Sequence, residues 1–77
     1  MSGEAERVAT IAKGLSKAQR EALVSCTPWD VEVGAGIAIA FCAHGFLEDS
    51  TIIDDGVQLS SRGLAVRAHL KETQHEG

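Results

Sequence analysis

The sequence has no tyrosine, one tryptophan and two phenylalanines among its 77 residues. Its core must therefore consist mainly of alanine, valine, isoleucine and leucine, and a chain of this length has only a small core in any case. The longest apolar run, residues 37–43, is far shorter than the roughly twenty residues that span a bilayer. No basic and then apolar leader opens the chain, so we expect a cytoplasmic protein that is not inserted in a membrane.

Cysteine and basic residues are also scarce. Two cysteines, Cys26 and Cys42, are too few for a disulfide framework, and we expect both thiols to be reduced and buried. Seven lysines and arginines against eleven aspartates and glutamates give a net charge of −4. Because proteins that bind nucleic acid mainly through phosphates usually carry a basic excess, this balance argues against a general nucleic-acid binder, although it leaves room for a local basic face.

We expect a single domain over residues 1–77, with 1–3 and 74–77 flexible. The first helix is predicted from about Ser2 to Lys13, with Gly14 as its stop. Its apolar residues recur at the spacing of one helical stripe and are Val8, Ile11, Ala12 and Leu15.

A second helix is predicted to run to about Ser25. Ser16 and Gln19 have the spacing of a capping box, in which each side chain accepts a hydrogen bond from the other residue's backbone N–H. Thr27-Pro28 ends this helix, because the residue before a proline avoids the helical region. Its inward residues are expected to be Ala18, Ala22 and Leu23.

The segment 28–36 alternates apolar and acidic residues and is interpreted as a linker with a short extended piece. We expect Trp29 to be a packing anchor against the first two helices; the alternative is a partly exposed residue at an interface, where tryptophan is enriched. Residues 37–44 are a short apolar run that periodicity alone leaves open between a buried strand and a buried helix. Their alanines and the following Gly45, a typical C-cap, favour a third helix. Ile37, Phe41 and His44 would share one face of it.

An Asp-Gly pair at 55–56 between two β-rich runs predicts a hairpin with a type I′ turn. That turn would pair Ile52 with Leu59 and Asp54 with Val57. Ser60 is then expected to cap a last helix that runs to about Thr73. The sequence therefore predicts an α+β domain, mainly α, with three helices, a two-stranded hairpin and a C-terminal helix.

This order resembles a winged helix-turn-helix, and three stretches resemble that family in detail. Residues 15–23, LSKAQREAL, resemble the L-[ST]-x-x-[QE]-x-x-[AV]-L opening of its second helix. Residues 45–48, GFLE, resemble its step from the recognition helix into the wing, and residues 59–66, LSSRGLAV, resemble its L-T-x-x-G-x-x-[AV] entry into the helix after the wing. The resemblance covers about residues 15–70 and is to MarR-type regulators and small phage proteins.

The resemblance implies a DNA-associated, transcription-regulator-like domain, whose third helix enters the major groove. Here that helix has no Lys, Arg, Asn or Gln to read bases, and the wing carries four acidic residues that phosphates would repel. The candidate DNA-binding residues therefore lie elsewhere, and they are Lys13, Lys17, Arg20, Arg62, Arg67 and Lys71. The alternative for these six is the solvated faces of two amphipathic helices.

The second hypothesis is a protein-interaction module, such as a phage-type inhibitor that docks on a nucleic-acid-handling complex. The third helix is apolar all round, and a domain this small cannot easily cover both of its faces. A partner protein or a homodimer would cover it, and the candidate interface residues are Trp29, Ile39, Phe41, Cys42 and His44.

Enzymatic chemistry is not expected. Cys42 and His44 are two positions apart and would point about 200° away from each other on a helix, so we expect them not to share a metal ion. No nucleophile elbow or phosphate-binding loop is present in the sequence. We therefore predict no catalytic residue, no metal, no cofactor and no small-molecule substrate.

Overall fold

The computed structural model describes residues 2–74, and this part of the chain contains four helices and one two-stranded antiparallel sheet. The mainly helical α+β class predicted from the sequence is confirmed. Met1 and residues 75–77, part of the segments expected to be flexible, lie outside the described residues. The elements are α1 (Ser2–Gly14), α2 (Lys17–Ser25), α3 (Ala35–His44), β1 (Leu47–Asp49), β2 (Val57–Leu59) and α4 (Ser61–Gln74).

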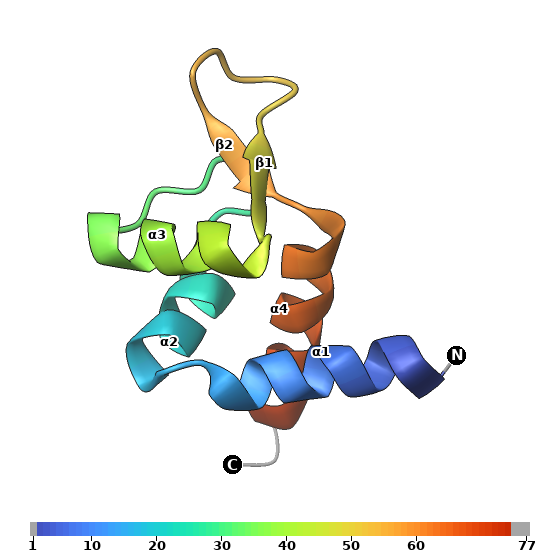
Figure 1. Ribbon diagram of the computed structural model, residues 1–77. Coiled ribbons are helices and arrows are strands. Elements are labelled where there is room, and N and C mark those ends of the chain that lie inside the picture. Colours follow the sequence, from blue (N-terminus) through green and yellow to red (C-terminus); the bar gives the residue numbers. More distant parts are fainter. Residues whose placement is uncertain (1, 75–77) are drawn as a thin grey trace.

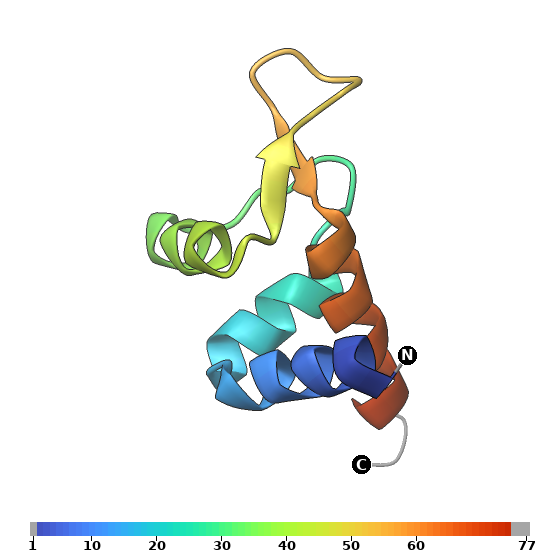
Figure 2. The ribbon, with the colours of Figure 1, turned by 45° about the vertical axis from the view of Figure 1, so that its right-hand side comes forward.

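The helices form one body, from which the β1–β2 hairpin projects (Figure 1). α4 packs against both α1 and α2, and α3 packs against α2. Figure 2 shows the hairpin extending away from the end of the molecule at which α1 lies. Over residues 2–74, no helix is both long enough and apolar enough to cross a membrane.

The core is built around two phenylalanines at the end of α3. Phe41 and Phe46 are fully buried, together with Leu23 of α2 and Val66 of α4. The two rings lie 5.6 Å apart with their planes tilted by 57°, a favourable arrangement for an aromatic pair. Three helices therefore meet at the point where the chain leaves α3 for the hairpin.

The capping box that starts α2 is confirmed. The Gln19 N–H donates to Ser16 Oγ and the Ser16 N–H donates to Gln19 Oε1, each at 3.1 Å. Leu23 is buried as predicted, but Ala18 is exposed and its predicted inward position is wrong. The reason is geometric, because Ala18 lies five positions from Leu23 and is therefore about 140° away around the helix.

The connection from α2 to α3 passes beside β2. The Leu59 N–H donates to the Pro28 carbonyl at 2.8 Å and the Val31 N–H to the Val57 carbonyl at 2.9 Å. Residues 27–30 form a turn there, so the extended piece predicted from the alternation does not begin at Trp29. The connection spans residues 26–34 and is longer than the three- or four-residue turn typical of a helix-turn-helix motif.

The packing role predicted for Trp29 is wrong. The Asp30 N–H donates to the Thr27 carbonyl at 3.1 Å, which closes a turn with Trp29 at one of its two central positions. A side chain at the tip of such a turn projects from the body, and Trp29 is 58% exposed.

The predicted third helix and its cap are confirmed. Gly45 has a φ of 76°, and its N–H bonds to the Cys42 carbonyl at 3.0 Å while the Phe46 N–H bonds to the Phe41 carbonyl at 2.9 Å. This is the Schellman pattern, in which a hydrophobic contact spans the cap. That contact is the Phe41–Phe46 pair, so the end of the helix and the centre of the core are one feature.

The hairpin forms in a different register from the predicted one. β1 and β2 pair Leu47 with Leu59 and Asp49 with Val57, so Ile52 lies in the connecting loop and not opposite Leu59. The buried Leu59 is thereby paired with the half-buried Leu47, which keeps apolar side chains together on the core side. The Gly56 N–H bonds to the Ile53 carbonyl at 3.2 Å and closes a turn whose central residues are Asp54 and Asp55. Asp55 has a φ of 61° but Asp54 has no positive φ, so the turn is not type I′.

The start of α4 lies against the core, and the cap predicted at Ser60 is confirmed. Ser60 Oγ accepts a hydrogen bond from the Gly63 N–H at 3.2 Å. Gly63 is buried, and a Cβ at this position would lie 2.7 Å from the Phe46 carbonyl oxygen. Only a residue without a side chain allows α4 to begin this close to the end of α3.

Candidate interaction surfaces

α3 presents one buried face and one exposed face. Phe41 is fully buried on the inner face, and Ile37 is half-buried. Phe41 therefore packs in the core, which removes it from the candidate interface. On the outer face Ile39 is 71% exposed and Cys42 is exposed, so the prediction that Cys42 is buried is wrong. The outer face is made of small and aliphatic side chains that the described chain leaves uncovered.

His44 ends α3 at the border between these faces. It is half-buried, and its ring stacks on Phe46 with ring centroids 5.1 Å apart. Its backbone carbonyl accepts a hydrogen bond from Arg62 Nη1 at 3.2 Å. An arginine near the negative end of the α3 dipole is electrostatically favourable there.

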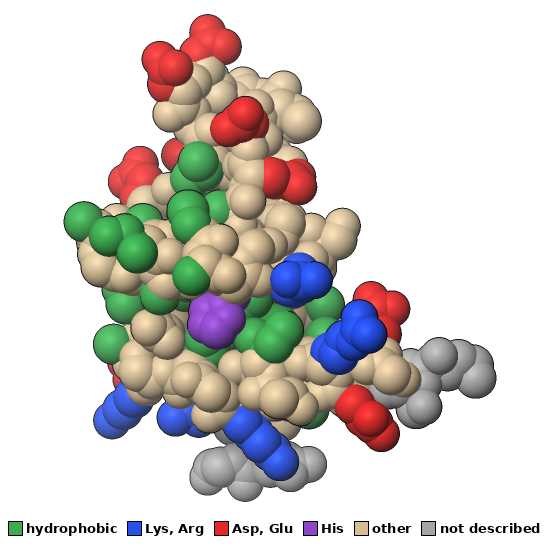
Figure 3. All heavy atoms as spheres, in the orientation of Figure 1, with side chains coloured by type: hydrophobic (Ala, Val, Ile, Leu, Met, Phe, Trp, Pro, Cys, Tyr) green, Lys and Arg blue, Asp and Glu red, His purple; other side chains and the backbone are tan. Residues whose placement is uncertain are grey.

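Charge is distributed unevenly over the molecule. In Figure 3, acidic side chains gather over the hairpin, basic side chains lie mostly at the opposite end, and hydrophobic side chains are exposed over α3. The exposed acidic residues of the hairpin are Glu48, Asp49, Asp54 and Asp55, and Glu32 is exposed on the segment that leads into α3. The outer face of α3 is thus uncharged but has acidic residues in the segments before and after it.

Most of the six candidate DNA-binding residues are exposed. The exposed ones are Lys13 of α1, Lys17 and Arg20 of α2, and Arg62 and Lys71 of α4. Lys17 and Arg20 line a shallow groove of about 420 Å³ with Leu70 and Thr73 of α4, which brings the start of α2 beside the end of α4. Glu21 also lines this groove and reduces its positive charge.

The other four candidates, Lys13, Arg62, Arg67 and Lys71, do not line this groove. Arg67 is half-buried, its Nε is buried without a hydrogen-bond partner, and its charge acts on the nearby, half-buried Cys26 thiol. Burial raises the pKa of Cys26, and Arg67 opposes that rise. Arg62 lies in the first turn of α4, whereas Lys71 lies in its last. The six residues therefore do not form one continuous exposed stripe.

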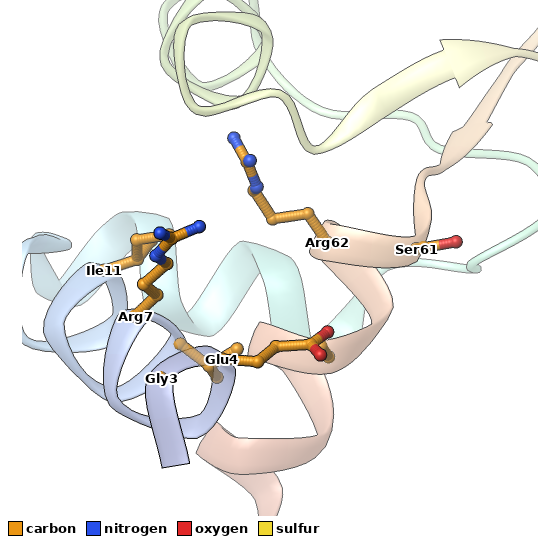
Figure 4. A pocket seen from close by; sticks show the side chains of 8 residues that line it. Gly3, Glu4, Arg7, Ile11, Ser61 and Arg62 are labelled. Carbon is orange, nitrogen blue, oxygen red and sulfur yellow. The ribbon is translucent and has the colours of Figure 1, made fainter. Parts of the chain in front are cut away.

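Arg62 instead shares a groove with Arg7, a residue for which the sequence predicts no role. The groove has a volume of about 490 Å³ and lies between α1 and the first turns of α4. Figure 4 shows the Arg7 and Arg62 side chains extending into the same hollow. The only sequence signal for Arg7 is its spacing of four from Ile11, which places it at the border of the apolar stripe of α1.

Within residues 2–74, no group of three or more His, Cys, Asp or Glu residues is placed to hold a metal ion. Comparisons of the chain with protein-family models, with curated proteins and with solved structures give no significant match. The surfaces described above are therefore the basis for inferring function.

Proposed function

We propose that this protein is a non-enzymatic, winged-helix-type interaction module that docks on a partner protein through the outer face of α3. The observation that carries the proposal is the exposure of Ile39, 71%, at the centre of a helix whose opposite face holds the fully buried Phe41. Ile39 is the most exposed large hydrophobic residue in the described chain. Exposed aliphatic surface of this kind on a small domain is typical of interaction sites.

The order of the elements supports the winged-helix assignment. A helix pair, α2 and α3, is followed directly by a projecting hairpin and then by α4, as in the family that the sequence resembles. The chemistry of α3 does not suit base reading, since His44 is its only strongly polar side chain and is half-buried. The long connection between α2 and α3 also departs from the geometry of a DNA-reading pair.

The charges near α3 indicate what the partner surface is like. Glu32 precedes the helix, Glu48 and Asp49 follow it, and all three are exposed. A partner with an apolar cleft and a basic rim would complement this arrangement, with the rim charges giving specificity and a faster association. Trp29, on the segment that leads into α3, is a second exposed anchor of the residue type enriched at binding hot spots.

The test is a comparison of two exposed aliphatic positions. A partner captured from a lysate is purified, and its affinity is measured for the wild type, Ile39→Asp and Leu64→Asp by titration calorimetry. Leu64 is 46% exposed on α4 and provides the matched control. We expect Ile39→Asp to weaken binding by at least about tenfold, equivalent to about 1.4 kcal/mol, and Leu64→Asp to have little effect. Equal affinities for all three proteins, each folded by circular dichroism, would refute the proposal.

The basic end of the molecule supports a second candidate function, association with DNA. Lys17 and Arg20 of α2 lie beside the end of α4. In Figure 3, most basic side chains lie at the end of the molecule away from the acidic hairpin. A titration of duplex DNA at two salt concentrations tests it, because phosphate contacts make the affinity fall steeply with salt. If this candidate is correct, Lys17→Ala/Arg20→Ala weakens binding and flattens the salt dependence. If no binding occurs at low salt, this second candidate is wrong.

A further inference from the structure

The groove between α1 and α4 combines two cations with an apolar floor. Its apolar side chains are Val8, Ile11 and Ala65, and its cations are Arg7 and Arg62. Arg62 uses one N–H to bond the His44 carbonyl at 3.2 Å, which leaves further guanidinium N–H groups free to donate. A second hollow of about 480 Å³ lies beside the first, and Arg7 and Arg62 line both hollows. The two arginine side chains are therefore accessible to a ligand from either hollow.

The groove is not uniformly basic. Glu4 lines the first hollow and Glu6 lines the second. Figure 4 shows the Glu4 side chain directed toward α4, whereas the two arginine side chains extend into the hollow between α1 and the end of α3. An occupant of the groove would therefore bring its negative charge to the arginine side.

The tip of the hairpin carries an exposed aliphatic side chain and exposed carboxylates, which suit a groove lined by apolar side chains and arginines. The loop between β1 and β2 contains Ile52, which is 70% exposed, and the exposed Asp54 and Asp55. Ser50 Oγ accepts hydrogen bonds from the N–H groups of Ile52 and Ile53 at 3.2 and 2.9 Å, so the loop has an internal framework.

The two isoleucines of this loop have different surroundings. Ile53 folds over Gly56, where a Cβ would lie 2.9 Å from Ile53 Cγ2. Ile52 projects into solvent in the same loop as two carboxylates. An ordered, protruding loop with one aliphatic side chain and adjacent acids is the shape and chemistry that the groove would accept.

We propose that the hairpin tip of one copy of this chain docks into the Arg7–Arg62 groove of a second copy. Ile52 lies against the apolar floor, and Asp54 and Asp55 accept hydrogen bonds from the two guanidinium groups. Arginine binds carboxylates in a bidentate manner and is the side chain best suited to such a contact. The acidic tip is complementary in charge to the arginine side of the groove, whereas two hairpin tips would repel each other.

This contact is head-to-tail, because the hairpin tip and the Arg7–Arg62 groove are different parts of the surface. Such heterologous contacts build rings when the rotation closes and open chains when it does not. The outer face of α3 is not part of the contact and stays free for a partner protein. The inference therefore does not rest on the proposed function, and Ile39→Asp separates the two.

The first experiment is sedimentation velocity at several protein concentrations in low salt. We expect the wild type to show a sedimentation coefficient that rises with concentration and falls back when salt screens the ion pairs. Arg7→Glu and Ile52→Ser should each weaken association by at least about tenfold. Arg20→Glu makes the same charge change as Arg7→Glu at an exposed position outside the groove, and Ile39→Asp alters α3; both should associate like the wild type.

The second experiment mixes the two defective variants. Arg7→Glu keeps its hairpin tip and Ile52→Ser keeps its groove, so one intact contact can form between them and association must stop at a 1:1 dimer. Arg7 and Ile52 are both exposed, and circular dichroism checks that each variant folds. A monomeric wild type at every concentration, association that survives Arg7→Glu, or a mixture that stays monomeric overturns the proposal.

Discussion

Two glycines of this chain differ in the space that a side chain would have: Gly63 has none, and Gly36 has ample room. Gly63 lies where a Cβ would come within 2.7 Å of the Phe46 carbonyl oxygen, a backbone atom that cannot move aside without shifting the core. Gly36 lies in α3, and a Cβ added there would have no atom to meet within 4 Å, so a methyl group is accommodated freely. The same substitution should therefore have opposite effects at the two sites.

We expect Gly63→Ala to lower the free energy of unfolding by about 1–3 kcal/mol, the usual cost of overpacking a core. Gly36→Ala should leave it unchanged or raise it by up to about 1 kcal/mol, because alanine restricts the unfolded chain and favours helix. Urea denaturation of both variants measures the difference. Equal stabilities would show that α4 does not approach Phe46 this closely.

The Cys26 thiol offers a pH-dependent test of burial. Burial raises its pKa, and the charge of Arg67 only partly opposes this. Because the folded pKa lies above the unfolded one, the protonated thiol stabilises the folded state at lower pH, and this contribution is lost as the pH rises through the folded pKa.

Alkylation follows the thiolate, so its rate reports this pKa directly. In a Cys42→Ala background, which removes the other, exposed thiol, we expect the rate for Cys26 to reach half its maximum at a higher pH in the folded protein than in urea. Arg67→Met should raise that pH further. A midpoint that is the same in both states would contradict the burial of Cys26.

At the scale of elements, α3 is the one on which the interpretation depends. Residues only two positions apart in the sequence lie on its opposite faces. Phe41 on the inner face is 0% exposed, whereas Ile39 on the outer face is 71% exposed. We expect Phe41→Ala to cost about 3–5 kcal/mol of stability and Ile39→Ala to change it by less than about 0.5 kcal/mol. Thermal or urea unfolding of the two variants distinguishes a helix with one free face from one that is buried all round, for which both changes would be costly.

Local signals in the sequence predict the features that have local causes. The capping box at Ser16 and Gln19, the stop at Gly45 and the cap at Ser60 each depend on residues within four positions, and the structure contains all three. The hairpin register is not predictable in the same way. The Asp-Gly cue is local, but the register is set by the pairing of Leu59 with Leu47, twelve positions away, and by the hydrogen bonds that Ser50 makes inside the loop.

For the candidate surfaces too, the sequence predicts what depends on neighbouring residues and misses what depends on distant ones. The apolar character of α3 predicts an uncovered side chain such as Ile39, since a small domain covers one face of a helix more easily than two. The prediction for Trp29 fails because an isolated tryptophan says nothing about the Thr27–Asp30 turn that carries it outward. The groove of Arg7 and Arg62 joins residues that are far apart in the chain, and no local pattern relates them.

At the scale of the whole molecule, the acidic, apolar and basic side chains on the surface lie in different regions. The acidic hairpin, the uncharged face of α3 and the basic end near α1 and α2 occupy separate regions of one small body (Figure 3). This separation allows a chain with a net charge of −4 to keep the two arginines of the Arg7–Arg62 groove, and Lys17 and Arg20 of α2, away from the acidic hairpin. It also means that each proposed contact has its own residues, and that a substitution in one region leaves the others intact.

The most direct measurement is to map the partner's footprint by NMR on the isotopically labelled protein. When the purified partner is added, we predict that the amide signals of residues 35–43 shift or broaden first, with Trp29 Nε1–H among the affected side chains. Signals from Lys13, Lys17, Arg20 and Lys71 should change little. A footprint confined to those four basic residues, with the α3 signals unmoved, would contradict docking through α3.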